Sequence, residues 1–320
     1  IHWSSRSHGH GRGNDMISVI IPAHNESSVI QRGLTALLDG AAAGELEVIV
    51  VANGCTDDTA AKVRAFGHSD VRLIEAAIGS KSNALNLGDV AATCFPRFYV
   101  DADVVLTFAH LRRIAAELET GAALAACPGM RMDLTSASWG VRAYYAIWRE
   151  LPYVREGMMG VGVYALSREG RGRFQQFPAI IADDGYVRLL FGAGERIAVE
   201  STYSVVTAPS RVSGLVKIKT RGRLGLYQLK AMFPELYSHD KKGKRYGSAL
   251  GIIARKPKFW PAAITYFWVN LATRWRARRQ LASLDQYKWE RDNSSRREDL
   301  ACQPCELHNH INQAEEDLTC

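Results

Sequence analysis

The sequence predicts an α/β domain with a mainly parallel β-sheet that is flanked by helices. In the first third of the chain, apolar segments typical of buried strands alternate four times with segments of helical periodicity. Such alternation is typical of parallel sheets, whose strands are covered by helices on both faces. Polar residues directly follow three of the strands, and ligands of these sheets bind at the carboxyl ends of the strands. The sequence therefore predicts a binding site at one edge of the sheet.

The four predicted strands are short, apolar and bounded by turn residues. Pro22 stops the first strand, and Asn53 and Gly54 form a turn after the second. The strands are expected at Ile17–Ile21, Leu46–Ala52, Val71–Ile74 and Arg97–Val100.

Helices are expected between these strands because apolar residues recur there at a spacing of three or four. Ser27, Thr56 and either Ser80 or Ser82 are suitable caps for the helices that follow them. Beyond Gly121 the regular alternation of strand and helix segments ends. Further strands are expected at 122–127, 196–200 and 203–207, an aromatic helix at 139–148 and a glycine-rich loop at 156–164.

The composition is that of a globular protein, with 47% hydrophobic and 23% charged residues. No segment reaches the ~18 consecutive apolar residues that indicate a membrane-spanning helix, and residues 1–14 do not resemble a signal peptide. The net charge of +7 is uneven, because Ser201–Leu284 holds 17 Lys or Arg but only two acids, Glu235 and Asp240. A basic end of this kind favours anionic partners.

Two pairs of carboxylates are candidate site residues. Asp101 and Asp103 follow a strand, where residues two apart point the same way, so both can face one Mg²⁺ or Mn²⁺ ion. Asp183 and Asp184 form a second pair at the start of a helix. Each pair has a simpler alternative, a capped turn for the first and a favourable helix dipole for the second.

Five motifs, in this order, resemble those of the family 2 glycosyltransferases of GT-A fold, a Rossmann-like fold. They cover about Ser18 to Leu190, and the segment 289–296 also resembles the close of some bacterial members. The motifs are Val19–Glu26, Val50–Asp57, Lys81–Gly88, Asp101–Asp103 and Asp183–Gly185.

The resemblance implies an inverting transfer of one sugar from a nucleotide-diphosphate sugar. It places Lys81 near the sugar or the diphosphate and Asn53 where an Asp usually reads uracil, so that UDP is favoured and GDP stays open. Asp101 is expected to face the ribose or the metal, and Asp103 to bind Mn²⁺ or Mg²⁺. The nucleotide pocket is expected to be lined by Pro22, Ala23, His24 and Glu26.

The same resemblance implies roles for the second acidic pair and for a basic segment. Asp184 is the candidate general base that removes the proton of the acceptor hydroxyl. Asp183 is expected to position a neighbouring group or to cap the helix that begins there. Lys217–Arg223 is expected to be a loop that closes on the donor, with Arg221 and Arg223 on its phosphates. The alternative is a solvated basic face.

The expected organisation is a disordered leader over 1–15, a GT-A domain over 16–210, a basic C-terminal helical region over 211–300 and a flexible tail over 301–320. A helix over 259–279 combines aromatic residues with arginines, which suits contact with an anionic membrane surface or, alternatively, packing on the domain. Membrane contact would suit a polyprenyl-linked acceptor, and the expected location is cytoplasmic, with a peripheral site on the inner face of the plasma membrane. A zinc site at Cys302, Cys305, His308 and His310 is disfavoured because its spacing is too short for common fingers.

Rival functions come from other classes. The basic end alone suits a nucleic-acid-binding protein, although no nucleic acid is expected as a partner. A non-catalytic membrane-associated member would have no need of both acidic pairs. A nucleotidyltransferase usually needs a glycine-rich phosphate loop after its first strand, and Pro22–Asn25 is not one.

Overall fold

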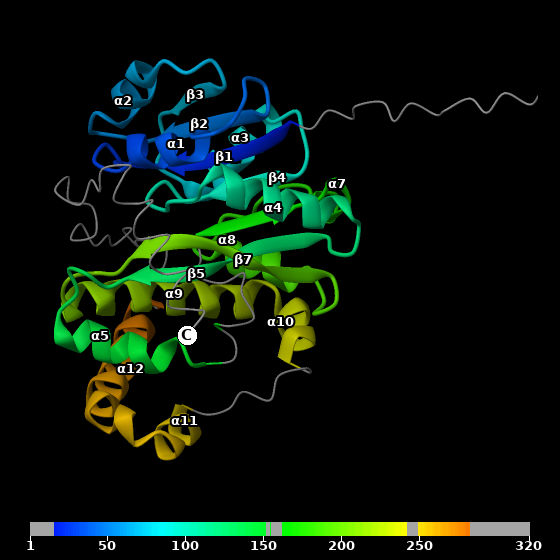
Figure 1. Cartoon of the computed structure of the whole chain (residues 1–320). Coiled ribbons are helices and arrows are strands. Elements are labelled where there is room, and N and C mark those ends of the chain that lie inside the picture. Colours follow the sequence, from blue (N-terminus) through cyan, green and yellow to red (C-terminus); the bar gives the residue numbers. More distant parts are fainter. Residues whose placement is uncertain (1–15, 152–153, 155–161, 242–248, 282–320) are drawn as a thin grey trace, which may run out of the picture.

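The computed structural model describes residues 16–151, 154, 162–241 and 249–281. The predicted leader, the tail with its cysteine and histidine residues and most of the glycine-rich loop lie outside the described residues. Among the described residues, seven strands form one sheet (Figure 1). The strands are β1 (Ile17–Ala23), β2 (Leu46–Asn53), β3 (Val71–Ala76), β4 (Arg97–Val100), β5 (Ala125–Asp133), β6 (Val163–Leu166) and β7 (Arg196–Thr207).

The strand order is β3-β2-β1-β4-β6-β5-β7. β1 pairs in parallel with β2 and β4, and β5 pairs in parallel with β7, while β6 runs antiparallel to both of its neighbours. The carboxyl ends of β1, β2, β4 and β5 therefore share one edge of the sheet. The mainly parallel α/β sheet predicted from the sequence is confirmed.

The helices follow the predicted alternation, and the side chains of Ser80 and Thr107 cap α3 and α4. The caps expected at Ser27 and Thr56 are wrong, because α1 and α2 begin after Val29 and Asp58, neither of which makes a side-chain cap bond. Their bounds are α1 (Ile30–Leu38), α2 (Thr59–Phe66), α3 (Lys81–Ala91), α4 (Phe108–Glu119), α5 (Trp139–Trp148), α7 (Arg168–Arg171), α8 (Asp183–Leu189), α9 (Val212–Met232), α10 (Pro234–Lys241), α11 (Ala249–Arg255), the 3-10 turn η1 (Pro257–Phe259) and α12 (Trp260–Leu281).

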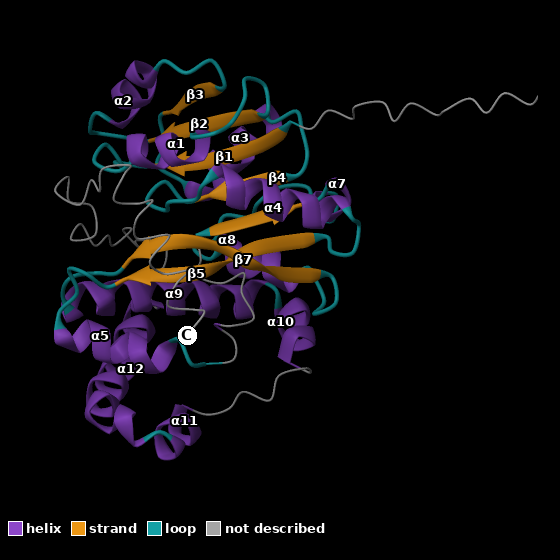
Figure 2. Cartoon of the chain, in the orientation of Figure 1, coloured by secondary structure: helices purple, strands orange, loops and turns teal. Residues whose placement is uncertain are grey.

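Helices cover both faces of the sheet, as Figure 2 shows. Buried residues of α1 and α4 share one core with the strands, and those of α3, α8 and α9 share a second core on the opposite face. A third cluster joins α5 with α9, η1 and α12 beyond the β5 side of the sheet. The C-terminal helices are thus packed against the α/β core rather than standing apart from it.

Two expectations on the later strands need correction. The strand expected at 122–127 extends to Asp133, and the two strands expected at 196–200 and 203–207 are one strand, β7. Ser201, at φ +62°, lies beside a register shift between β5 and β7. That irregularity interrupts the apolar pattern within a continuous strand, which is why the pattern indicated two strands.

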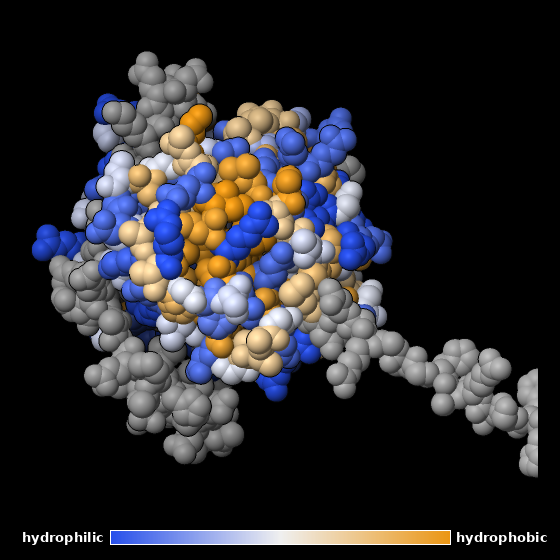
Figure 3. Space-filling model, turned by 90° about the horizontal axis from the view of Figure 1, so that it is seen from above, coloured by the Kyte–Doolittle hydropathy of each residue, from blue (hydrophilic) through white to orange (hydrophobic). Residues whose placement is uncertain are grey.

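The surface is mostly hydrophilic, with local exceptions. Figure 3, which looks onto the end of the molecule that carries α2 and β3, shows a hydrophobic centre ringed by hydrophilic residues. No helix of the described ranges is long and apolar enough to cross a membrane.

Candidate functional site

The loops after β1 and β2 are tied together at the carboxyl edge of the sheet. His24 donates a hydrogen bond from Nδ1 to the carbonyl of Asn53, at 2.6 Å. Asn53 is buried and donates in turn from Nδ2 to the carbonyl of Ala23, at 2.8 Å. Because the amide nitrogen is held inside, the acceptor oxygen Oδ1 is the atom left without a hydrogen-bond partner among the described residues.

Glycine is required where a third loop meets these two. Gly54 has φ +56°, and a Cβ atom there would lie 2.5 Å from the backbone nitrogen of Gly79, in the loop after β3. A Cβ atom on Gly79 would in turn lie 3.3 Å from the His24 ring. The three loops therefore pack backbone against backbone, which leaves no space for side chains between them.

Lys81, the first residue of α3, joins the two acidic pairs predicted from the sequence. Its Nζ lies 2.7 Å from Oδ1 of Asp101 and 2.9 Å from Oδ1 of Asp183. Tyr164 on β6 donates a hydrogen bond to the other oxygen of Asp183, at 3.2 Å. We call Lys81, Asp101, Asp183 and Tyr164 the Lys81 cluster; it brings together residues up to about one hundred positions apart in the chain at one edge of the sheet.

The Lys81 cluster carries more negative than positive charge. Burial alone would lower the pKa of Lys81, but Asp101 and Asp183 raise that pKa well above its usual value. The pKa of Asp101 is also raised, because burial and the charges of Asp183 and Asp103 outweigh Lys81. The Asp101 side chain is 39% exposed, so water offsets part of its shift. An excess of carboxylate is an arrangement that a cation would stabilise.

The two acidic pairs differ in how their members are buried. Asp101 and Asp103 are both half-buried, whereas Asp184 is half-buried and Asp183 is 4% exposed. Asp184 accepts a hydrogen bond from the Gly185 backbone, at 2.7 Å. In the second pair, one carboxylate is therefore enclosed and the next one is more accessible.

Tyr164 is a member of the site that sequence reasoning missed. Its hydroxyl stays protonated, because burial and Asp183 raise its pKa well above the usual value. The ring stacks on Tyr99, its cross-strand partner on β4, with 4.9 Å between the ring centroids. A tyrosine in the strand after a glycine-rich loop was a weak signal, since tyrosine is common in strands.

Gly162, the described end of the glycine-rich loop, approaches Asp101 closely. It has φ +66°, its carbonyl accepts a hydrogen bond from the Asp101 backbone at 2.8 Å, and a Cβ atom there would lie 3.5 Å from the Asp101 carboxylate. The backbone at Gly162 therefore lies directly against Asp101.

The remaining residues of the predicted nucleotide pocket lie in the first loop and its strand. Pro22 and Ala23 end β1, and Ala23 is buried. Glu26 is 5% exposed, and its backbone nitrogen donates to the Thr59 hydroxyl at 2.7 Å. Its backbone carbonyl accepts from the first residue of α1. The backbone of Glu26 therefore links the first residue of α1 to the first residue of α2.

The basic loop predicted at Lys217–Arg223 is wrong, because these residues belong to the helix α9. Arg221 is half-buried, and Arg223 donates to the side-chain oxygen of Asn270 on α12 at 3.3 Å. Gly222 and the basic residues suggested a loop, but Leu215, Leu224 and the other buried positions recur at helical spacing. Gly225 lets α9 pack closely on Ala182, directly before Asp183.

The described residues hold no group of three or more His, Cys, Asp or Glu side chains arranged to bind a metal ion. Mg²⁺ and Mn²⁺ sites often have only one or two protein carboxylates, and the remaining ligands come from phosphates and water. Asp103, with Asp101 beside it, provides hard oxygen ligands of this kind in a carboxylate-rich setting. The residues present therefore fit an ion that is shared with a phosphate ligand.

Comparisons with known proteins agree on the fold. Residues 18–160 match the family model described as glycosyl transferase family 2. No curated protein matches the chain. Among solved structures, the chain is similar to the mannosyltransferase PcManGT from Pyrobaculum calidifontis in complex with GDP-Man and Mn²⁺, with a TM-score of 0.57 and 21% identity over 93% of this chain and 79% of that one.

A second similar structure is glucosyl-3-phosphoglycerate synthase from Mycobacterium tuberculosis, in complex with Mn²⁺, UDP and glucosyl-3-phosphoglycerate. The TM-score is 0.50, with 20% identity over 68% of this chain and 79% of that one. Identity at this level speaks for the fold. The family model thus matches the part of the chain from residue 18 to residue 160, and the fold of the chain is similar to that of both glycosyltransferase structures.

Proposed function

We propose that the chain is an inverting glycosyltransferase that moves one sugar from a nucleotide-diphosphate sugar to a glycan or lipid-linked acceptor. The observation that carries the proposal is the Lys81 cluster, where both acidic motifs meet one lysine at the carboxyl edge of the sheet. Two unrelated helix caps would have no reason to converge on one cation. The catalytic domain is proposed to cover residues 16–210.

The donor pocket is proposed to lie between the loops that follow β1, β2 and β3. His24 and Asn53 would hold the base, with Pro22, Ala23 and Glu26 around it. The Asn53 Oδ1 can accept a hydrogen bond from a ring N–H of the base, which favours uracil and leaves guanine open. The two similar structures contain GDP-Man and UDP, respectively.

The diphosphate is proposed to lie by the Lys81 cluster. Negative charge builds on the diphosphate as the sugar bond breaks, and nearby cationic groups stabilise it. Lys81 would supply one such group, and Arg221 and Arg223 are further candidates. Asp103, with Asp101 or alone, would hold Mn²⁺ or Mg²⁺, which when bound neutralises the same charge.

Asp184 is proposed as the general base for the acceptor hydroxyl. A base must be reachable by its substrate, and Asp184 is half-buried whereas Asp183 is enclosed by Lys81 and Tyr164. Asp183 would instead hold Lys81 and the start of α8 in place. A positioned base contributes roughly 10²–10⁴ in rate.

A lipid-linked acceptor is supported by the exposed face of α12. Five apolar side chains at helical spacing are between 56% and 79% exposed, and the residues that follow them are rich in arginine. Aromatic residues beside arginines suit the interface of an anionic membrane, on the inner face of the plasma membrane in this proposal. The five residues are Trp260, Ile264, Trp268, Leu271 and Trp275.

Sedimentation with anionic vesicles tests this membrane face. Leu271→Glu changes a side chain that is 69% exposed and is therefore expected to keep the fold but weaken binding to vesicles rich in acidic lipid. Equal binding of this variant and the unaltered chain would contradict the proposed face.

Release of nucleoside diphosphate from UDP-sugars and GDP-mannose, with and without Mn²⁺, tests the main proposal. Asp103→Asn is expected to abolish the Mn²⁺-dependent part of this release. Asp184→Asn is expected to keep donor binding and to lose about 10²-fold or more in turnover. Glu119→Gln, an exposed change on α4, is the matched control. Unchanged release in Asp103→Asn would contradict the metal role, and unchanged turnover in Asp184→Asn would place the base elsewhere.

A further inference from the structure

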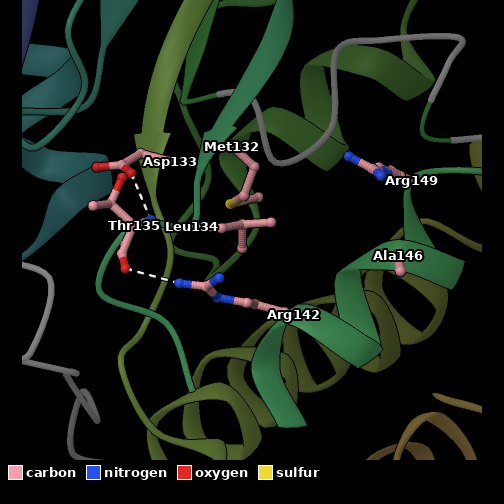
Figure 4. A pocket seen from close by; sticks show the side chains of 7 residues that line it. All are labelled: Met132, Asp133, Leu134, Thr135, Arg142, Ala146 and Arg149. Carbon is pink, nitrogen blue, oxygen red and sulfur yellow. Dashed lines mark hydrogen bonds between the residues drawn. The ribbon is translucent and has the colours of Figure 1, made fainter. Parts of the chain in front are cut away.

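A hollow lies between the carboxyl end of β5 and the helix α5, on the opposite side of the sheet order from the proposed nucleotide loops. Its volume is about 530 Å³. Figure 4 shows Met132 and Leu134 at its centre, with Arg142 of α5 on one side and Arg149, directly after α5, on another. No residue predicted for the donor site lines this hollow.

The strand register places the hollow at the same edge as the Lys81 cluster. Val100 pairs with Val163, and Ala126 pairs with Ala165, so that antiparallel pairing brings Pro128 level with the end of β4. Residues of β5 beyond Pro128 therefore project past the point where Asp101 leaves the sheet. At about 3.3 Å per residue, Met132 extends roughly 13 Å beyond that level. The hollow thus flanks the space in front of the proposed catalytic residues.

The polar wall of the hollow is mainly cationic. Arg142 is fixed by hydrogen bonds from Nε to the Ala137 carbonyl, at 2.9 Å, and from Nη2 to the Thr135 carbonyl, at 3.0 Å. Arg149 is exposed, and its side chain has neither a hydrogen bond nor an ion pair within the described part of the chain. The acid of this wall, Asp133, accepts a hydrogen bond from the Thr135 backbone at 2.9 Å. With respect to the described residues, the guanidinium donors of Arg149 are therefore available to a ligand.

The rest of the lining is apolar and continues into a second hollow of about 360 Å³. Met132, Leu134 and Arg149 line both hollows, and Met130 and Trp148 extend the apolar wall of the second. Arg131 lines the second hollow as well, with its guanidinium over the Tyr203 ring at 3.4 Å. A ligand that fits both parts combines an anionic group with an apolar chain.

We propose that these joined hollows hold the acceptor by a phosphoryl group, with an apolar chain of the acceptor along Met132 and Leu134. Arg149 and Arg142 would bind the phosphoryl oxygens, because guanidinium groups form forked hydrogen bonds with phosphate. The assignment rests on the glycosyltransferase function proposed above, and it names the class of acceptor for that function: a phosphate ester of an apolar alcohol.

Calorimetric titration of the full chain with methyl phosphate, hexyl phosphate, hexanoate and inorganic phosphate tests the site. Hexyl phosphate is expected to bind most tightly, because the apolar wall adds to the contacts of the arginines. Arg149→Gln is expected to weaken hexyl phosphate binding about tenfold or more, through the loss of a charge-assisted contact. Arg142→Gln is a second variant with the same expected direction, although Arg142 also fixes the loop at Thr135. Arg72→Gln on β3, an exposed arginine at the far end of the sheet, is the matched control.

The outcomes separate the possible ligands and the two proposals. Methyl and hexyl phosphate binding equally well would overturn the apolar part, and hexanoate binding as tightly as hexyl phosphate would overturn the preference for phosphoryl groups. If the Arg149→Gln, Arg142→Gln and Arg72→Gln variants all bind hexyl phosphate equally well, the proposed site is overturned. Nucleotide-sugar hydrolysis is measured in the same preparations. Hydrolysis without phosphate binding contradicts the acceptor site alone, whereas phosphate binding without hydrolysis contradicts the proposed enzyme function alone.

Discussion

Two buried clusters of charge lie at opposite ends of β4 and are built from the same kinds of residue. At the carboxyl end, the Lys81 cluster has two acids around one cation. At the amino end, Asp89 of α3 is paired with Arg97 at 2.9 Å and Arg171 at 2.5 Å, so one acid serves two cations. Tyr99 donates to Asp89 at 2.6 Å, as Tyr164 does to Asp183. We call Asp89, Arg97, Tyr99 and Arg171 the Asp89 cluster.

The difference between the clusters lies in how fully the acids are satisfied. Both oxygens of Asp89 are occupied, and the pKa of Asp89 is lowered, because hydrogen bonds from Arg171 and Tyr99 outweigh its burial. The pKa of Asp101 is raised, because burial and the charges of two further carboxylates outweigh the effect of Lys81. The Asp89 cluster is therefore saturated and structural, whereas the Lys81 cluster has capacity for another cation. Stacking of Tyr99 on Tyr164 joins the two clusters.

Asp89→Asn tests the structural side of this comparison and has the largest expected effect. It leaves Arg97 and Arg171 without their counter-charge, and breaking a buried pair costs about 3–5 kcal/mol in the free energy of unfolding. Urea unfolding at pH 7 measures this loss, and Asp58→Asn, an exposed acid without a cap bond, is the control.

The pH dependence of the same variant gives a second check. A carboxyl group with a lowered pKa stabilises the fold above its unfolded pKa and loses that contribution as the pH falls. The stability gap between the unaltered chain and Asp89→Asn should therefore shrink as the pH falls below about 4. A gap that does not change with pH would show that packing, rather than charge, explains the loss.

Lys81→Met tests the functional side, where the expected loss is in turnover. Removal of one preorganised group that stabilises developing charge costs about 10²–10³ in rate. The loss of stability should be smaller than for Asp89→Asn, because Asp101 is 39% exposed and can be solvated, and the buried Asp183 keeps its hydrogen bond from Tyr164. Donor hydrolysis and urea unfolding are measured together, with the exposed Lys230→Met on α9 as the control. Full activity with a stability loss equal to that of Asp89→Asn would make both clusters structural.

The sequence predicted most of the Lys81 cluster, at the carboxyl end of β4, but not the Asp89 cluster at its amino end. Asp101, Asp103 and Lys81 stand next to strong strand or helix boundaries, so local pattern predicted their place at the carboxyl edge. The contact of Lys81 with Asp183, beside Tyr164, depends on the antiparallel placement of β6 between β4 and β5. The local sequence pattern does not encode this strand order. The Asp89 cluster was missed for the same reason, because Arg171 lies 82 positions from Asp89.

The helix α9 shows the opposite failure, where local pattern was misleading. Gly222 and the basic residues around it are typical of a loop, yet packing against α8 and α12 stabilises a helix of 21 residues. Tertiary contacts of this kind override weak helix propensity. The proposed contact of Arg221 and Arg223 with the donor therefore requires these side chains to act from a fixed helix.

Lys219, on the same helix, extends the comparison to a half-buried cation without an acid among the described residues. Its Nζ lies 3.8 Å from the centroid of the Trp148 ring, and no acid pairs with it in the described chain. Burial and the charge of Arg223 lower the pKa of Lys219 to about 7. Between this value and the unfolded value of 10.5, the unfolded chain binds a proton that the folded chain does not. Stability should therefore rise with pH across that range.

Lys219→Met should remove this rise and stabilise the chain near pH 7 by about 1–2 kcal/mol, since attraction of the aromatic rings for the cation offsets part of the cost of burial. Urea unfolding of both proteins between pH 6.5 and 9.5 measures the difference. Lys217→Met, an exposed change two residues away, should keep the slope of the unaltered chain. If Lys219→Met keeps the same dependence of stability on pH, Lys219 of the unaltered chain remains charged among the rings. A half-buried cation in this fold then needs no acid to hold its proton.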